Sequence, residues 1–147
     1  MGKLKFILIS FLALNLNAQK KSVENDKLIA CLSEPKFLSW FNICKKESDT
    51  IYIYNNVKKF ENFISTKTSC GKLLVLQKSS IEINVDKGIL NCGDKIVLYK
   101  YEVKNGKCKL SFLNICSNAN MVIELNSKNK VIELFDWIFL RTPATNS

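Results

Sequence analysis

Histidine is absent from the 147-residue sequence, and its absence removes a large part of catalytic chemistry. Hydrolases with a histidine base, histidine-ligated metal sites and histidine acid–base steps are all excluded. No two cysteines have the CxxC spacing of a zinc site or a redox-active disulfide. We therefore expect a protein that is not an enzyme and that holds no metal and no cofactor.

Arginine, proline and glycine are also scarce. Arg141 is the single arginine, so lysine carries almost all of the positive charge behind the net +9. Recognition of bases and phosphates favours the bidentate arginine fork, so we do not expect a nucleic-acid partner. Two prolines and five glycines leave no linker-like stretch, which indicates one domain.

The first 18 residues are typical of a secretory signal peptide. Lys3 and Lys5 precede an apolar run over residues 6–16, and Ala18 ends a plausible cleavage site. The apolar run is too short to span a bilayer, and no later segment is suited to do so. We expect a protein exported to the periplasm or the medium, with no membrane span in its mature chain.

The mature domain would cover residues 19–147. Leu28-Ile29-Ala30-Cys31 resembles the lipobox of bacterial lipoproteins, in which the cysteine is lipidated. A charged segment at residues 24–27 separates this box from the apolar run, which argues against lipidation at Cys31. An exported domain with an even number of cysteines instead indicates three structural disulfides. The six are Cys31, Cys44, Cys70, Cys92, Cys108 and Cys116.

The clearest structural signal is a β-hairpin around Asn105-Gly106. Both central residues of a type I′ turn need positive φ, which asparagine and glycine tolerate best. A two-residue loop fixes the register. The apolar face then pairs Val103 with Cys108, Tyr101 with Leu110 and Tyr99 with Phe112, and the polar face pairs Glu102 with Lys109, Lys100 with Ser111 and Lys104 with Lys107.

Other elements follow from periodicity and from turn residues. Helices are expected over residues 26–32 and 33–46, where Phe37, Trp40 and Phe41 have helical spacing. A further helix is expected over residues 57–64, followed by a loop to Gly71. Strands are expected over residues 50–54, 72–77 and 80–86. A second hairpin around Ser127-Lys128 would set Ile123 opposite Ile132 and Met121 opposite Leu134, with a bulge at a partly buried Asp136.

Strand geometry limits the disulfide pairings. Cys108 and Cys116 lie about 25 Å apart along one strand, so they cannot bond to each other. Cys92–Cys116 at the open end of the hairpin is the preferred pair, and Cys70–Cys92 is the second choice. Cys108, at the turn, would then bond to Cys31 or Cys44.

These elements predict a mainly β fold. We expect a small antiparallel barrel or sandwich of about six to eight strands, with one or two short N-terminal helices. An α+β roll, with a helix on a curved sheet, is the alternative.

A ligand surface is harder to place. Tyr52 and Tyr54 alternate with Ile51 and Ile53 in one strand, so either pair is a candidate for exposure. The polar face of the hairpin carries a basic patch without interleaved aromatic residues, formed by Lys100, Lys104, Lys107 and Lys109. Such a patch either binds an acidic polymer or only protects exposed strands from aggregation, and the second interpretation carries more weight.

No stretch of the chain identifies a family. We expect an exported, non-enzymatic binding or inhibitor module, whose partner in the envelope is a protein or an anionic glycan. A hydrolase of cell-wall or extracellular glycan that uses paired carboxylates is one alternative. A structural component of an envelope assembly is another, and a large exposed apolar patch would favour it.

Overall fold

A computed structural model describes residues 23–60, 64–78 and 95–138 of the chain. Its helical part comprises residues 23–32, α2 (Pro35–Trp40) and the 3-10 helix η1 (Ile43–Lys45). The strands are β1 (Thr50–Asn55), β2 (Ile64–Lys67), β3 (Leu73–Lys78), β4 (Ile96–Lys104), β5 (Lys107–Asn114), β6 (Ala119–Leu125) and β7 (Val131–Ile138). Strands are the main secondary structure of the described residues, which confirms the predicted mainly β fold.

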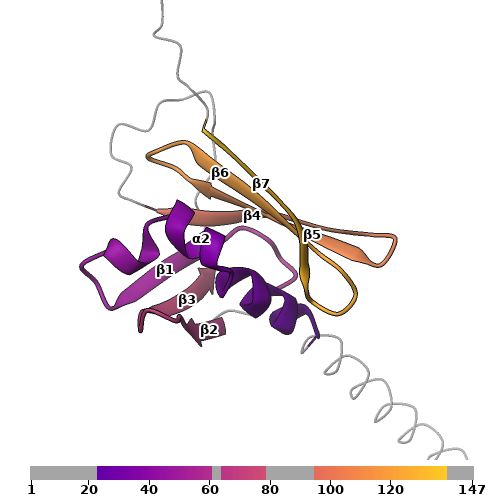
Figure 1. Cartoon of the computed structure of the whole chain (residues 1–147), viewed down its shortest axis with the longest axis horizontal. Coiled ribbons are helices and arrows are strands. Elements are labelled where there is room, and N and C mark those ends of the chain that lie inside the picture. The colour runs from indigo at the N-terminus through magenta and orange to yellow at the C-terminus, as the bar shows by residue number, and fades with distance from the viewer. Residues whose placement is uncertain (1–22, 61–63, 79–94, 139–147) are drawn as a thin grey trace, which may run out of the picture.

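The seven strands form one open, mixed sheet in the order β2-β3-β1-β4-β5-β6-β7 (Figure 1). β1 pairs in parallel with both β3 and β4, and the remaining pairs are antiparallel. The predicted antiparallel barrel or sandwich is therefore wrong. Turn chemistry in the sequence revealed only hairpins, whereas the parallel pairs join segments that are distant in the chain.

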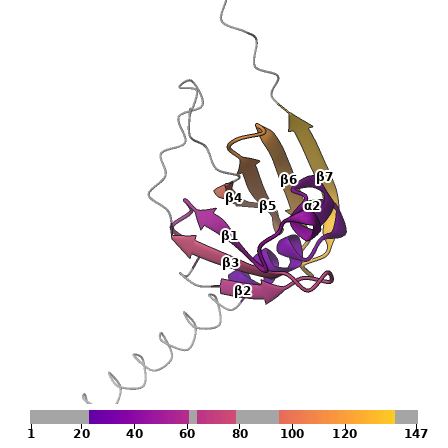
Figure 2. The same ribbon diagram turned by 90° about the vertical axis from the view of Figure 1, so that its left-hand side faces the viewer.

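The helices cover one face of this sheet, which curves around them (Figure 2). We call this the inner face and the opposite one the outer face. The ring of Phe37 in α2 packs edge-on against Phe112 of β5, with 4.9 Å between the centroids. Phe41 packs against Phe37 at the same distance. This arrangement is closer to the alternative roll than to a barrel, and it confirms the N-terminal helices.

The first helix is fixed to the sheet by a partly buried polar cluster. The Tyr101 hydroxyl of β4 donates a hydrogen bond to the Glu24 carboxylate. Lys27 and Lys59 approach the same carboxylate to 3.8 and 3.7 Å. Phe60 packs edge-on against the Tyr101 ring, 5.1 Å away. Residues from three separate segments thus hold the helix over the hairpin.

The hairpin of β4 and β5 has the predicted turn. Asn105 and Gly106 have φ values of +51° and +72°. The register agrees with the sequence prediction from the turn back to Lys100 opposite Ser111. Beyond it a bulge at Tyr99 shifts the pairing by one residue, so Leu98 lies opposite Phe112. The predicted pairing of Tyr99 with Phe112 is therefore wrong.

The hairpin of β6 and β7 exists, but its register is not the predicted one. Leu134 lies opposite Ile123, and Asp136 lies opposite Met121. The cause is a longer turn, because the side-chain oxygen of Asn126 accepts hydrogen bonds from the backbone N–H groups of Lys128 and Lys130. The irregularity falls next to Leu125 instead of at Asp136, which is exposed and not partly buried.

The region between β1 and β3 also differs from the prediction. No helix forms over the described part of residues 57–64, where the chain turns instead. The Asn55 side chain accepts a hydrogen bond from the Val57 N–H, which favours a turn over a helix start. β2 then lies in the predicted loop and pairs with β3. β1 and β3 confirm two predicted strands, and the strand expected over residues 80–86 lies outside the described residues.

One disulfide, Cys44–Cys70, joins η1 to the turn before β3, with 5.8 Å between the Cα atoms. It excludes Cys70–Cys92, and it also excludes Cys44 as the partner of Cys108. Cys31 and Cys108 are free thiols in the core, so the structure departs from the predicted set of three bonds. The Cys92–Cys116 pair stays a prediction, because Cys92 lies outside the described residues.

Burial keeps these two thiols protonated. It raises the pKa of Cys108 to about 11, and it raises the pKa of Cys31 well above its ordinary value, with a further contribution from Cys108 itself. A thiol with such a pKa is almost entirely protonated at neutral pH and is a poor nucleophile.

Within the described residues, no helix is long and apolar enough to cross a membrane. The predicted signal peptide, residues 1–18, lies outside them.

Candidate functional site

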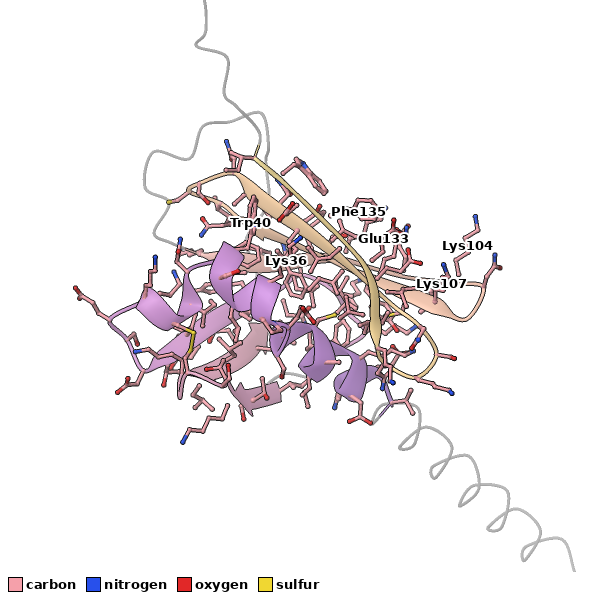
Figure 3. The ribbon with its side chains drawn as sticks, viewed as in Figure 1. Lys36, Trp40, Lys104, Lys107, Glu133 and Phe135 are labelled. Atoms are coloured by element: carbon pink, nitrogen blue, oxygen red, sulfur yellow. A yellow bond between two sulfur atoms is a disulfide. The ribbon has the colours of Figure 1, made fainter. Side chains whose placement is uncertain are left out.

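The residues predicted to form a ligand surface lie in two separate places, β1 and the hairpin of β4 and β5. Tyr52 and Tyr54 project from β1 on the outer face, away from Ile51 and Ile53 in the core. Lys100 and Lys109 lie on the outer face of β4 and β5. Lys100 lies opposite Ser111, and Lys109 lies opposite Glu102, in the next cross-strand pair on that face. Lys104 and Lys107 lie at the tip of that hairpin (Figure 3). The structure does not bring the tyrosines and these lysines into one site.

Three of the four hairpin lysines have a carboxylate partner. Lys107 and Lys109 approach the two oxygens of Glu124 in β6 to 3.0 and 2.8 Å. Lys100 lies 3.0 Å from Glu102 on the same strand. Two carboxylates thus contact three of the four lysines and offset half of their positive charge. This favours the interpretation that the lysines protect exposed strands from aggregation.

The contacts between Glu124 and its two lysines also shift proton affinities. Hydrogen bonds from Lys109 and Lys107 lower the pKa of Glu124. The same interaction raises the pKa of Lys109. Both groups are therefore held in their charged forms at neutral pH. An added anion would have to compete with a carboxylate that is already in place.

A hollow of about 550 Å³ adjoins the two tyrosines. We call it the tyrosine–lysine hollow. Its lining comes from the segment after α2, from β1 and from the residue before β4. The residues are Asn42, Lys45, Lys46, Glu47, Ser48, Thr50, Ile51, Tyr52, Tyr54 and Lys95. The volume falls within the range of small-ligand sites.

Alternation and parallel pairing create this hollow. Ile51 and Ile53 face the core, so Tyr52 and Tyr54 project from the opposite face of β1. β4 runs parallel beside β1, which brings Lys95 next to the tyrosines. The Lys95 ammonium lies 5.7 Å from the centroid of the Tyr54 ring, within range of a cation–π contact.

The wall formed by residues 42–48 is held in place on both sides. The disulfide at Cys44 ties it to the turn before β3. At its far end, the Asp49 carbonyl accepts a hydrogen bond from the Leu73 N–H, and the Asp49 carboxylate pairs with Lys72 at 3.2 Å. The wall is thus anchored to β3, the strand on the other side of β1 from β4.

Positive charge predominates in the hollow. Its lining includes three lysines and one glutamate, which gives a net charge of +2. Burial lowers the pKa of Lys46, so its ammonium group has lost part of its hydration. The Lys95 ammonium beside the Tyr54 ring is suited to hold an anionic group whose remaining surface lies on an aromatic ring.

Sequence reasoning identified the tyrosines of this hollow but missed its lysines. Lys45 and Lys46 follow an aromatic helix, and Lys95 precedes a strand. Nothing local connects them, because the parallel pairing of β1 with β4 brings Lys95 close. The doublet at Lys45 and Lys46, just before the strand with the tyrosines, was the one available signal.

A second hollow, of about 700 Å³, lies over the outer face of the antiparallel strands. Its lining includes Tyr99, Lys100, Lys109, Phe135 and Trp137. The Lys109 ammonium lies 6.0 Å from the centroid of the Phe135 ring. The prediction that no aromatic residue accompanies the hairpin lysines is therefore wrong. Phe135 and Trp137 come from β7, whose register was mispredicted.

One pair of carboxylates bears on the hydrolase alternative. Glu124 and Glu133 lie opposite each other on β6 and β7. A general acid needs a raised pKa, whereas the lysine contacts lower that of Glu124. Among the described residues, no group of three or more histidine, cysteine or acidic side chains is placed to hold a metal ion.

Comparison with known proteins finds no matching family model, no matching curated protein and no matching solved structure, so the site rests on its own geometry.

Proposed function

We propose that this protein is an exported, non-enzymatic binding module that takes an anionic ligand in the tyrosine–lysine hollow. One observation carries the proposal: three lysines gather around Tyr52 and Tyr54 in a hollow with a single acidic residue. Three of the four hairpin lysines, in contrast, already contact a carboxylate within the fold. A surface disulfide, Cys44–Cys70, supports an oxidising compartment and hence export.

An acidic glycan is the ligand class that fits best. Sugar rings pack against aromatic side chains, and Tyr52 offers such a surface because it is 49 % exposed. Carboxylate or sulfate groups on the sugar would lie near Lys45 and Lys95. The lysine ammonium is a point charge without the planar fork of arginine, which suits a flexible acidic chain more than a fixed phosphate geometry.

The test is a titration with two oligosaccharides of equal length, one acidic and one neutral, followed by calorimetry or NMR. We expect an oligogalacturonate to bind and a neutral oligogalactoside to bind at least about tenfold more weakly, because charge-assisted contacts are lost. Raising the salt concentration should weaken binding of the acidic chain.

Variants locate the site. Lys95→Ala and Tyr54→Ala should each weaken binding of the oligogalacturonate by about tenfold. Lys107→Ala is the matched control, since it removes a lysine that is already paired with Glu124, and affinity should change less than about twofold. Equal losses from Lys95→Ala and Lys107→Ala would contradict the assignment, as would equal binding of both oligosaccharides.

A further inference from the structure

β7 is an edge strand with unusual exposure. Among the strands that the structure describes, it pairs with β6 alone and ends the sheet. It is eight residues long, so its free edge presents a row of backbone N–H and C=O groups. Its sequence, VIELFDWI, contains neither proline nor lysine, which commonly protect such edges.

The side chains of β7 add an apolar surface to this edge. The exposed fractions are 44 % for Ile132, 44 % for Phe135, 36 % for Trp137 and 54 % for Ile138. β2, at the other end of the sheet, has only four residues, and Ser65, Thr66 and Lys67 follow its one buried isoleucine. One edge is therefore short and polar, whereas the other is long and apolar. Figure 3 shows Phe135 and Glu133 on β7.

We propose that β7 pairs antiparallel with β7 of a second copy of the chain, about a two-fold axis at Phe135. The two sheets would then continue into one another across the axis. This interface goes beyond the proposed ligand site and does not depend on it, because the tyrosine–lysine hollow lies on β1 and not on β7.

Charge selects among the symmetric registers. A two-fold axis perpendicular to the sheet places each residue opposite one on the same face, so the axis passes through a residue of β7. An axis at Glu133 or Asp136 would set like charges directly opposite each other, which is destabilising. Axes at Leu134 and Phe135 both avoid this conflict.

Exposure then favours Phe135 over Leu134. With the axis at Phe135, that ring meets its own copy, and Ile138 lies toward Ile132, the extra residue at the β-bulge of β7. The three most exposed apolar residues of β7 then lie in one interface. With the axis at Leu134, Phe135 would face Glu133 and Ile132 would face Asp136. The remaining pairs in the Phe135 register are Glu133 with Trp137 and Leu134 with Asp136, and each sets one acid against an apolar residue.

A cross-linking experiment tests the register. Phe135→Cys places two thiols across the axis, where Cβ atoms of opposed residues lie about 5 Å apart. A short bis-maleimide should convert most of this variant into a covalent dimer. Val103→Cys is the matched control, because Val103 is a similarly exposed strand residue, 51 % accessible, outside the interface. Equal cross-linking of the two variants, or none at position 135, would overturn the proposal.

A charge variant tests the interface without cross-linking. Phe135→Lys sets two ammonium groups opposite each other, close to the positive charge of Lys109. The variant should therefore be monomeric at concentrations at which the unmodified chain sediments at twice the monomer mass. Val103→Lys should remain dimeric, and circular dichroism checks that both variants fold. A monomeric unmodified chain at high concentration, or a dimer that persists in Phe135→Lys, would reject the interface. Because the ligand hollow is on β1, loss of the dimer would leave oligogalacturonate binding intact, so the two proposals fail separately.

Discussion

The lysines of the tyrosine–lysine hollow and those of the β4–β5 hairpin differ in the location of their counter-charges. On the hairpin, cross-strand register brings Lys107 and Lys109 against Glu124. In the hollow, three lysines meet around two tyrosines with a single acidic residue. A count of lysines along the sequence treats both regions alike. Their availability to a ligand depends on which strand lies alongside, and only the fold reveals that.

The two regions are also held together differently. The hairpin depends on a two-residue turn and on pairs close in sequence. The hollow depends on a disulfide between residues 26 positions apart and on parallel pairing across the sheet. We therefore expect changes in the covalent link to affect the hollow most and changes in the turn to affect the hairpin most.

The largest expected effect is the loss of the disulfide. Cys44→Ser should lower the free energy of unfolding by about 3–4 kcal/mol, since the closed loop would no longer restrict the unfolded chain. Urea denaturation measures this change, and affinity for the oligogalacturonate should fall as the wall at residues 42–48 loosens. The double variant Cys44→Ser/Cys70→Ser should be no less stable than the single one. A clear further loss would mean that Cys70 contributes in another way.

A smaller effect is expected at the hairpin turn. Gly106→Val places a β-branched residue at a φ of +72°, which should cost about 1–3 kcal/mol in thermal or urea unfolding. Open space surrounds the site where a Cβ would lie, so the cost reflects backbone strain alone. Gly106→Asn is the control, because asparagine tolerates this conformation. Affinity for the ligand at the tyrosine–lysine hollow should be unchanged in both variants. A loss of affinity in Gly106→Val would contradict the expectation that the turn affects only the hairpin.

The smallest expected effect concerns the carboxylate between the hairpin lysines. The folded-state pKa of Glu124 is lowered, so its contribution to stability is present at neutral pH and is lost as the pH falls below about 4. Glu124→Gln should thus lower the melting temperature by a few degrees at pH 7, with a smaller difference at pH 3. Glu102→Gln removes an exposed ion pair and should change little at either pH. A pH-independent deficit in Glu124→Gln would indicate that packing matters more than charge.

The sequence predicted those parts of the fold in which the deciding interactions are local. Asn105-Gly106 and the alternation around it established most of one hairpin register. The predicted register of the second hairpin was wrong because the Asn126 side chain supports a longer turn than the predicted two-residue loop. The pairing of β1 with β3 and with β4 involves segments separated by loops, and no local pattern encodes it.

The candidate site was predictable to a similar extent. Alternation in β1 indicated that Tyr52 and Tyr54 share a face, which the structure confirms. The approach of Lys95 and of the doublet at Lys45 and Lys46 required the parallel pairing and the disulfide. The hairpin lysines drew attention in the sequence because they cluster, but their partner Glu124 lies on β6, a strand whose pairing with β5 had not been predicted.

The bulge at Tyr99 changes which residues of β4 point toward the helices. On its N-terminal side, Ile96 and Leu98 face the helices, and beyond the extra residue the inward positions pass to Tyr101 and Val103. An uninterrupted strand would turn Lys100 and Glu102 toward the helices and would point Tyr101 away from Glu24. A single inserted residue thus lets one strand serve an apolar core at one end and a charged surface at the other, and it keeps the first helix attached to the sheet.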